Sequence, residues 1–165
     1  MSRNLTLLLI VVSLATPIFA QTDPGHPKTD VAFWVDHWSR PPVTIFGPEE
    51  DDFYSNVQVI LFPYNDHDDP SNPEAVDRNV QWLKAHPNVR FYVDGYASSR
   101  GDWLYNINLS QRRANWVKET LVSRGIAESR IKVAAGWGES YPLCPETGDD
   151  CWSKNRLVRL VYSPQ

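Results

Sequence analysis

Two adjacent arginines, Arg112 and Arg113, follow a loop rich in glycine and serine and could together bind an anion. A guanidinium group offers a fork of N–H donors that matches a carboxylate, and the first turn of a helix offers further backbone N–H groups. We place Ser110 at the N-cap of a helix, which puts both arginines in its first turn. Cations cost about 0.3–1 kcal/mol each at that end of a helix, so their presence there points to a nearby anion. The alternative is that both lie on the solvated surface or pair with Asp94 or Asp102.

Ser98 and Ser99, in the preceding loop, are candidate nucleophiles. A serine nucleophile needs a base beside it, but all four histidines, at positions 26, 37, 67 and 86, lie outside this stretch. The chain also lacks the Gly-x-Ser-x-Gly motif that presents a reactive serine. We therefore predict a binding protein that is not an enzyme and that uses no cofactor.

A second polar group, formed by Asp66, His67, Asp68 and Asp69, follows the first predicted strand. Carboxylates and imidazoles can bind metals, but the spacing here lacks the glycine and the terminal glutamate of a calcium loop. We predict no metal site. A metal-dependent hydrolase at these residues is the remote alternative.

Four short segments rich in apolar and β-branched residues are predicted to be strands with at least one buried face. They are residues 57–62, 89–93, 131–135 and 157–162. Apolar residues at helical spacing predict one helix that starts at Pro73 and is capped by Asn72, and a second that runs from Ser110 to Gly125. The resulting order, βαβαββ, predicts an α/β two-layer sandwich in which both main helices cover one face of a mixed sheet.

Several separated blocks of sequence resemble one known family. They occur in the order Gly95-Tyr-Ala-Ser-Ser-Arg-Gly101, Tyr105-Asn106, Leu109-Ser-Gln-Arg-Arg-Ala114 and Lys154-Asn-Arg-Leu-Val158. This pattern is similar to the C-terminal domain of outer membrane protein A, which the peptidoglycan-associated lipoprotein and flagellar stator proteins share. The resemblance runs from about residue 56 to residue 162 and thus covers most of the chain.

The resemblance implies a function in the cell envelope. Members of the family bind the peptide stem of peptidoglycan without breaking it, usually through meso-diaminopimelate, a diamino diacid. The resemblance therefore implies anchoring or sensing of the cell wall in the periplasm of a Gram-negative-type envelope, in association with the outer membrane. The alternative is a protein-interaction module on the same frame that has lost peptidoglycan binding and docks an envelope protein.

The resemblance also assigns roles to individual residues. Arg113 matches the arginine that clamps the ligand carboxylate, Asn106 matches a polar residue of the pocket wall, and Arg156 matches an arginine near the rim. Ser98 stands where the family has an aspartate for the ligand ammonium, and the loss of that charge is worth about 1–3 kcal/mol. Three outcomes stay open: weaker binding of the same ligand, a different ligand, or a replacement carboxylate from Asp102, Asp94 or Asp66.

The N-terminal part of the chain divides into two predicted segments ahead of the domain at residues 56–165. Residues 1–20 have the positive start, the apolar run and the small final residue, Ala20, of a secretory signal peptide. No cysteine follows this run closely, so a lipid anchor is not predicted there. Residues 21–55 form an extension rich in proline and aromatic residues, in which Trp34 and Trp38 either pack against the domain or dock a partner. We interpret the acidic run at residues 49–52 as a solvated boundary.

Charge and cysteine content narrow the class of protein further. The net charge of −4 and the sequence pI of about 5.5 argue against a nucleic-acid partner, which requires a basic surface. The two cysteines, Cys144 and Cys151, are predicted to form a disulfide because an exported protein meets an oxidising compartment. A zinc site would need further ligands that the neighbouring sequence does not provide.

Overall fold

The computed structural model of the protein describes residues 48–164. The predicted signal peptide, the two tryptophans at positions 34 and 38 and most of the predicted extension lie outside the described residues. These predictions, and the domain boundary near residue 56, therefore stay predictions. Within residues 48–164, no helix is both long and apolar enough to cross a bilayer.

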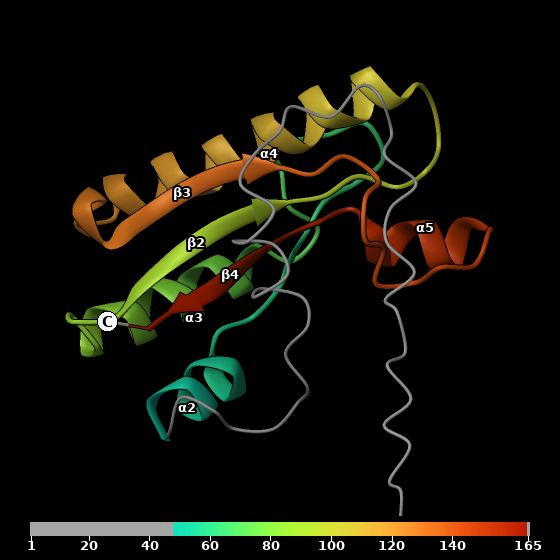
Figure 1. Ribbon diagram of the computed structural model, residues 1–165. Coiled ribbons are helices and arrows are strands. Elements are labelled where there is room, and N and C mark those ends of the chain that lie inside the picture. The colour runs from blue at the N-terminus through green and yellow to red at the C-terminus, as the bar shows by residue number, and fades with distance from the viewer. Residues whose placement is uncertain (1–47, 165) are drawn as a thin grey trace, which may run out of the picture. The chain divides into compact units, whose positions relative to one another are not determined.

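Four strands form one mixed sheet in the spatial order β1-β4-β2-β3 (Figure 1). Strand β2 pairs in parallel with β3, whereas β4 runs antiparallel to both β1 and β2. The strand bounds are β1 (Ile60–Leu61), β2 (Arg90–Gly95), β3 (Ile131–Gly136) and β4 (Leu157–Ser163). The predicted α/β fold with a mixed sheet is confirmed.

Helices α3 (Pro73–Ala85) and α4 (Trp103–Ser123) cover the same face of this sheet (Figure 1). Val76 and Leu83 of α3 and Val117 and Leu121 of α4 join the core beneath them, together with Phe91 of β2. Burying a large apolar side chain stabilises a fold by about 1.5–3 kcal/mol relative to leaving it exposed. This shared core fixes both helices against the sheet.

Helix α2 (Pro48–Asn56) contributes to the same core, which the sequence did not predict. Phe53 is fully buried and makes edge-on contacts with Trp82 and Tyr162, at centroid distances of 5.4 and 5.7 Å. The hydroxyl of Tyr162 donates a hydrogen bond of 2.7 Å to Glu49. The acidic run at residues 49–52 therefore lies in a helix that is tied to the core, while Glu49, Asp51 and Asp52 are themselves exposed, as the interpretation of a solvated segment expects.

Strand β1 is shorter than the predicted strand at residues 57–62, because only Ile60 and Leu61 pair with β4. Two asparagine side chains bond the backbone of residues 58–61. Asn79 donates to the carbonyl of Gln58 and accepts from its N–H group. Asn72 accepts from Leu61 N–H and donates to the carbonyl of Val59. Asn72 does occupy the N-cap position of α3, but its side chain makes no capping hydrogen bond, so the predicted capping role is wrong.

Helix α4 begins at Trp103, with Asp102 as its N-cap, and not at Ser110 as predicted. The Asp102 carboxylate accepts a hydrogen bond of 3.0 Å from Tyr105 N–H, which is a capping interaction at the N-terminus. Arg112 and Arg113 therefore lie in the interior of the helix. The prediction that they occupy its first turn is wrong, and so is the helix-dipole argument for an anion that rested on it.

The misplaced start has a physical reason, because α4 touches the backbone of the sheet where its apolar pattern slips. A Cβ atom on Gly95 would overlap the carbonyl oxygen of Ser110, and one on Gly136 would overlap the backbone of Gln111. Ser110 is fully buried there, and its hydroxyl donates to Ile107 O and accepts from Gly138 N–H, both at 2.8 Å. A small polar residue at this contact resembles a helix cap in sequence.

The other end of α4 agrees with the sequence. Gly125 adopts a φ of +92°, which favours glycine, and its N–H group donates to Val122 O. Ile126 N–H donates to Leu121 O, and Ile126 is buried. This pair of hydrogen bonds is the Schellman motif, so the predicted helix stop at Gly125 is confirmed.

The position of the N-cap gives a direct test by substitution. Asp102→Ala should lower the free energy of unfolding by about 1 kcal/mol, because Tyr105 N–H loses its acceptor. Asp102→Asn keeps an acceptor and should stay within roughly 0.3 kcal/mol of the wild type. Urea unfolding followed by circular dichroism measures both. Equal losses in the two variants would show that the charge of Asp102, and not its capping hydrogen bond, stabilises the helix.

Candidate functional site

The predicted binding residues gather around one hollow, which four segments of the chain enclose. These are the loop after β1, the loop from β2 to α4, one side of α4, and the residue that precedes β4. The hollow measures about 310 Å³ together with the space at its mouth. Arg113, Ser98, Asn106 and Arg156 all line it, so the structure brings these predicted ligand residues together, whereas Asp102 does not line it.

Arg113 is the most buried charged side chain of the site, with an exposed fraction of 0%. Its guanidinium donates three hydrogen bonds to backbone carbonyls. Nε bonds Asp66 O at 2.7 Å, Nη1 bonds Tyr96 O at 2.8 Å, and Nη2 bonds Pro63 O at 3.0 Å. Arg113 therefore connects the loop after β1 to the loop after β2 through these hydrogen bonds.

The charge of Arg113 has no carboxylate partner among these contacts. Burial, and then the nearby cation Arg156, lower the pKa of Arg113 to about 10. The side chain thus stays protonated at neutral pH. Arginine has five N–H donors, so one N–H on each terminal nitrogen remains beyond the three carbonyl bonds.

Two further arginines line the same hollow. Arg100 lies 4.7 Å above the ring of Tyr64, and its side chain is 51% exposed. Arg156 donates from Nε to Phe62 O at 3.2 Å, and burial lowers its pKa. The hollow therefore presents one buried and two more accessible guanidinium groups, which is a suitable arrangement for an anion.

A disulfide-closed loop positions Arg156. Cys144 and Cys151 are bonded at an S–S distance of 2.07 Å, which confirms the predicted pairing. Helix α5 (Asp149–Asn155) lies within this region and was not predicted. Asn155 is buried and makes two hydrogen bonds, of 2.9 and 2.7 Å, with the backbone of Cys144. The loop thereby fixes the residue directly before Arg156.

Ser98 and Asn106 add neutral polar groups to the lining of the hollow, and they are 3% and 2% exposed. Asn106 donates from Nδ2 to Glu139 Oε2 at 2.9 Å, so its Oδ1 is available as an acceptor. Sequence reasoning missed Glu139. Its only signal was its place shortly after the predicted strand at residues 131–135, next to Gly138, whose carbonyl accepts from Ala97 N–H.

The three carboxylates proposed as replacements for the missing acid do not line the hollow. Asp102 caps α4. Asp94 lies within β2 and is 3% exposed. Asp66 folds back on its own loop, and hydrogen bonds led by Asp68 N–H hold its pKa below the usual range.

The group formed by Asp66, His67 and Asp68 brings potential ligand atoms within 4.8 Å of one another. Asp66 Oδ1 already accepts hydrogen bonds from backbone N–H groups of the same loop. A hydrogen-bonded turn explains this cluster fully, and we assign no metal to it.

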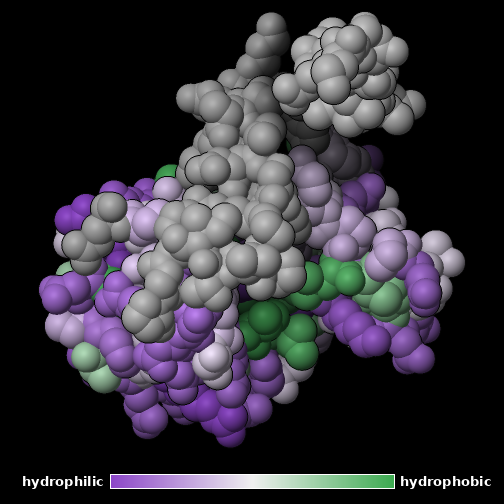
Figure 2. Space-filling view, turned by 60° about the horizontal axis from the view of Figure 1, so that its bottom comes forward, coloured by the Kyte–Doolittle hydropathy of each residue, from purple (hydrophilic) through white to green (hydrophobic). Residues whose placement is uncertain are grey.

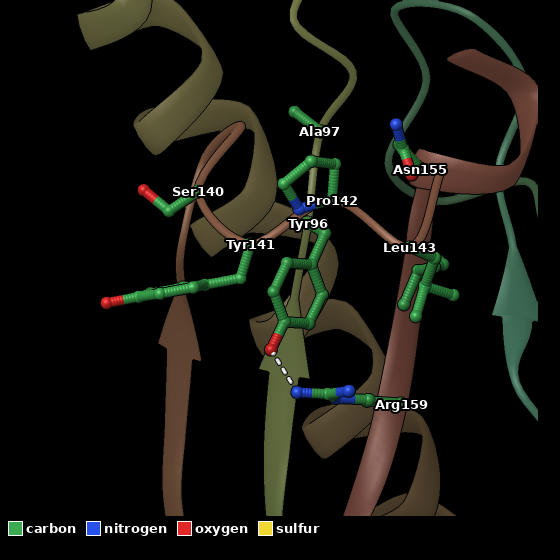
Figure 3. Close-up of a pocket in the computed structure, with 9 residues that line it drawn as sticks. Tyr96, Ala97, Ser140, Tyr141, Pro142, Leu143, Asn155 and Arg159 are labelled. Atoms are coloured by element: carbon green, nitrogen blue, oxygen red, sulfur yellow. Dashed lines mark hydrogen bonds between the residues drawn. The ribbon is translucent and has the colours of Figure 1, made fainter. Parts of the chain in front are cut away.

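A second, smaller hollow lies at the ends of β2 and β4 (Figure 3). It is lined mainly by apolar side chains, including Pro142 and Leu143, and Arg159 donates to the Tyr96 hydroxyl at 2.8 Å inside it. Burial raises the pKa of that hydroxyl, so Tyr96 stays neutral. This hollow has one arginine, already bonded to Tyr96, and offers an apolar surface in place of an anion site.

The structure thus defines a mixed-sheet α/β domain with an arginine-lined hollow beside β1, β2 and α5. A model of the OmpA family matches residues 68–156, which is more than half of the chain, so the protein belongs to the OmpA family. The family resemblance seen in the sequence is therefore confirmed.

Two curated relatives carry the name peptidoglycan-associated lipoprotein. The one from Buchnera aphidicola subsp. Baizongia pistaciae is 27% identical over 167 residues, which cover 97% of this chain and 95% of the relative. The one from Brucella melitensis biotype 1 is 34% identical over 90 residues, which cover 54% of this chain and 53% of the relative. The chain thus matches about half the length of the Brucella protein.

Solved structures show the same fold. The crystal structure of the peptidoglycan-associated lipoprotein from Burkholderia pseudomallei superimposes with a TM-score of 0.59 at 25% identity. The match covers 64% of this chain and 90% of that chain.

The hydrogen bonds of Arg113 predict that its substitution destabilises the fold, apart from any effect on ligand binding. Arg113→Ala should lower the free energy of unfolding by about 3 kcal/mol or more, since it leaves three buried carbonyls unpaired and opens a cavity. Arg100→Ala, at a half-exposed arginine of the same hollow, should cost less than about 1 kcal/mol. Urea unfolding measures both. A variant at position 113 as stable as the one at position 100 would contradict the structural role.

Proposed function

We propose that this domain binds the peptide stem of peptidoglycan without cleaving it. Its role is then to anchor or sense the cell wall in the periplasm of a Gram-negative-type envelope, in association with the outer membrane. The observation that carries the proposal is the convergence of Arg113, Arg100 and Arg156 on one hollow. Membership of the OmpA family and the names of the relatives support it.

The stem residue that fits this hollow is meso-diaminopimelate, because its second carboxylate distinguishes it from an ordinary amino acid. Arg156 and Arg100 can hold that carboxylate by charge-assisted hydrogen bonds, and the buried charge of Arg113 lies behind them in the lining of the hollow. Ser98 and Asn106 supply neutral polar contacts in the same hollow. No histidine is found among the residues that line the hollow, which supports binding without catalysis.

Calorimetric titration of the full-length protein with a soluble muropeptide that contains meso-diaminopimelate tests the proposal. We expect saturable binding, and we expect amidation of the diaminopimelate carboxylate to abolish it. Arg156→Gln should weaken binding about tenfold, because one cation at the carboxylate is lost.

Arg124→Gln is the matched control for that variant. Arg124 pairs with Asp77 at the far end of α4, so the substitution removes the same charge away from the hollow and should leave the affinity unchanged. Equal affinity for the free and amidated ligands would contradict the carboxylate site. Absence of binding to either ligand would contradict the proposed function.

A second candidate function, docking of an envelope protein, is favoured by the apolar hollow around Leu143, whose side chain is 56% exposed. Figure 2 shows a hydrophobic patch between hydrophilic regions on the face turned toward the viewer. If docking is the function, Leu143→Asp should abolish capture of a defined envelope protein, whereas Arg156→Gln should leave it intact. Weakened muropeptide binding in Arg156→Gln, with binding retained in Leu143→Asp, supports the first proposal.

A further inference from the structure

The arginine-lined hollow carries a surplus of positive charge. Of the eleven residues that line it, three are arginines and none is an aspartate or a glutamate. A diamino diacid in its usual form brings an ammonium group as well as a carboxylate. The hollow as it stands has partners for the carboxylate and no anion for the ammonium.

The neighbouring carboxylates are each engaged elsewhere. Asp102 caps the first turn of α4, and Asp66 accepts hydrogen bonds from its own loop. Glu139 accepts from the side-chain amide of Asn106. Asp149, which is 88% exposed, lies 3.6 Å from Arg100 at the edge of the site. None of these four carboxylates is among the residues that line the hollow.

Electrostatics within the hollow agree with this count. Burial and then the charge of Arg156 lower the pKa of Arg113, while the charge of Asp66 raises it. Burial also lowers the pKa of Arg156, where Asp149 raises it and Arg100 lowers it. Asp66 and Asp149 offset part of the repulsion among the arginines, but neither of them lines the hollow. These guanidinium groups therefore repel one another in the unliganded protein. A ligand anion relieves that repulsion, whereas a ligand ammonium adds to it.

The lining of the hollow includes neutral acceptors for a ligand amine, Ser98 and Asn106. Ser98 is buried in the wall of the hollow, and the bond to Glu139 leaves Asn106 Oδ1 free to accept. An amide N–H can donate a hydrogen bond to such an oxygen without bringing a charged group into the hollow. A buried ammonium, in contrast, loses hydration that one or two neutral acceptors replace only partly.

We propose that this hollow selects stem peptides in which the side-chain amine of the diamino diacid is acylated, and disfavours those in which that amine is free. The inference rests on the proposed function, since it concerns the ligand of the same site. Such an amide arises when one stem is cross-linked to another, and also when the amine is simply acetylated. The cross-linked and the acetylated stem both present a carboxylate beside an uncharged amide, which is the chemical group that the hollow would recognise.

The test is a calorimetric titration of the full-length protein with three soluble muropeptides. One carries the free side-chain amine, one carries the N-acetylated amine, and one is a cross-linked dimer. We expect the acetylated form to bind at least about fivefold more tightly than the free amine. Tight binding of the dimer would identify the cross-link as a source of the ligand, and binding of the acetylated monomer alone would identify the simple acyl group.

Substitutions at the hollow provide the matched comparison. Ser98→Asp restores an anion and should reverse the preference toward the free amine, whereas Ser98→Ala should leave the preference in place. Arg100→Gln, at a half-exposed position that tolerates change, should reduce the ratio of the affinities for the acetylated and free-amine muropeptides, because it lowers the positive charge of the hollow. Arg124→Gln, far from the hollow, should not affect the ratio.

The outcomes separate the two proposals. If the wild-type protein binds the free amine as tightly as the acetylated form, or more tightly, the selection for acylated stems is overturned and peptidoglycan binding still stands. If none of the three muropeptides binds, the proposed function itself is overturned.

Discussion

The site depends on the burial of one cation, Arg113, among backbone carbonyls. Its three hydrogen bonds reach Pro63, Asp66 and Tyr96, which belong to two loops far apart in the sequence. A buried charge is costly unless its donors are satisfied, so both loops must keep their carbonyls in place. The same side chain therefore fixes the shape of the hollow and supplies its central positive charge.

Helix α4 can carry Arg113 to this position because it lies against the backbone of the sheet. The contact needs glycine at positions 95 and 136 and a small polar residue at position 110. Hydrogen bonds from Gly138 N–H to Ser110 and from Ala97 N–H to Gly138 O then tie the loop after β2 to the turn after β3. The glycine- and serine-rich stretch thus serves close packing first, and the wall of the hollow is a consequence of it.

The sequence predicted features that depend on regular apolar spacing or on local turn chemistry. The strands at residues 89–93, 131–135 and 157–162, the stop at Gly125 and the disulfide were all recognisable on that basis. Prediction from the sequence failed where a tertiary contact, and not the local sequence pattern, decides the role of a residue. Ser110 looks like a cap and is a buried contact, whereas Asn72 stands at a cap position and bonds a strand instead.

Arg113, Ser98, Asn106 and Arg156 line one hollow, which agrees with the family resemblance, and their roles toward a ligand stay predictions. Spacing along the chain could not show that Arg113 bonds three carbonyls, or that Glu139 orients Asn106. Both facts depend on loops brought together by the sheet. Loss of binding in Arg113→Ala would therefore result from disruption of the two loops as well as from the loss of a positive charge near the ligand.

The most direct test of the central claim is an NMR titration of the isotopically labelled full-length protein with a soluble diaminopimelate muropeptide. The account predicts shifts at the Arg113 Nε–H group and at the backbone amides of residues 97–101, which surround the arginine-lined hollow. Shifts confined to residues 140–143, around the apolar hollow, would contradict it and place the ligand elsewhere on the domain.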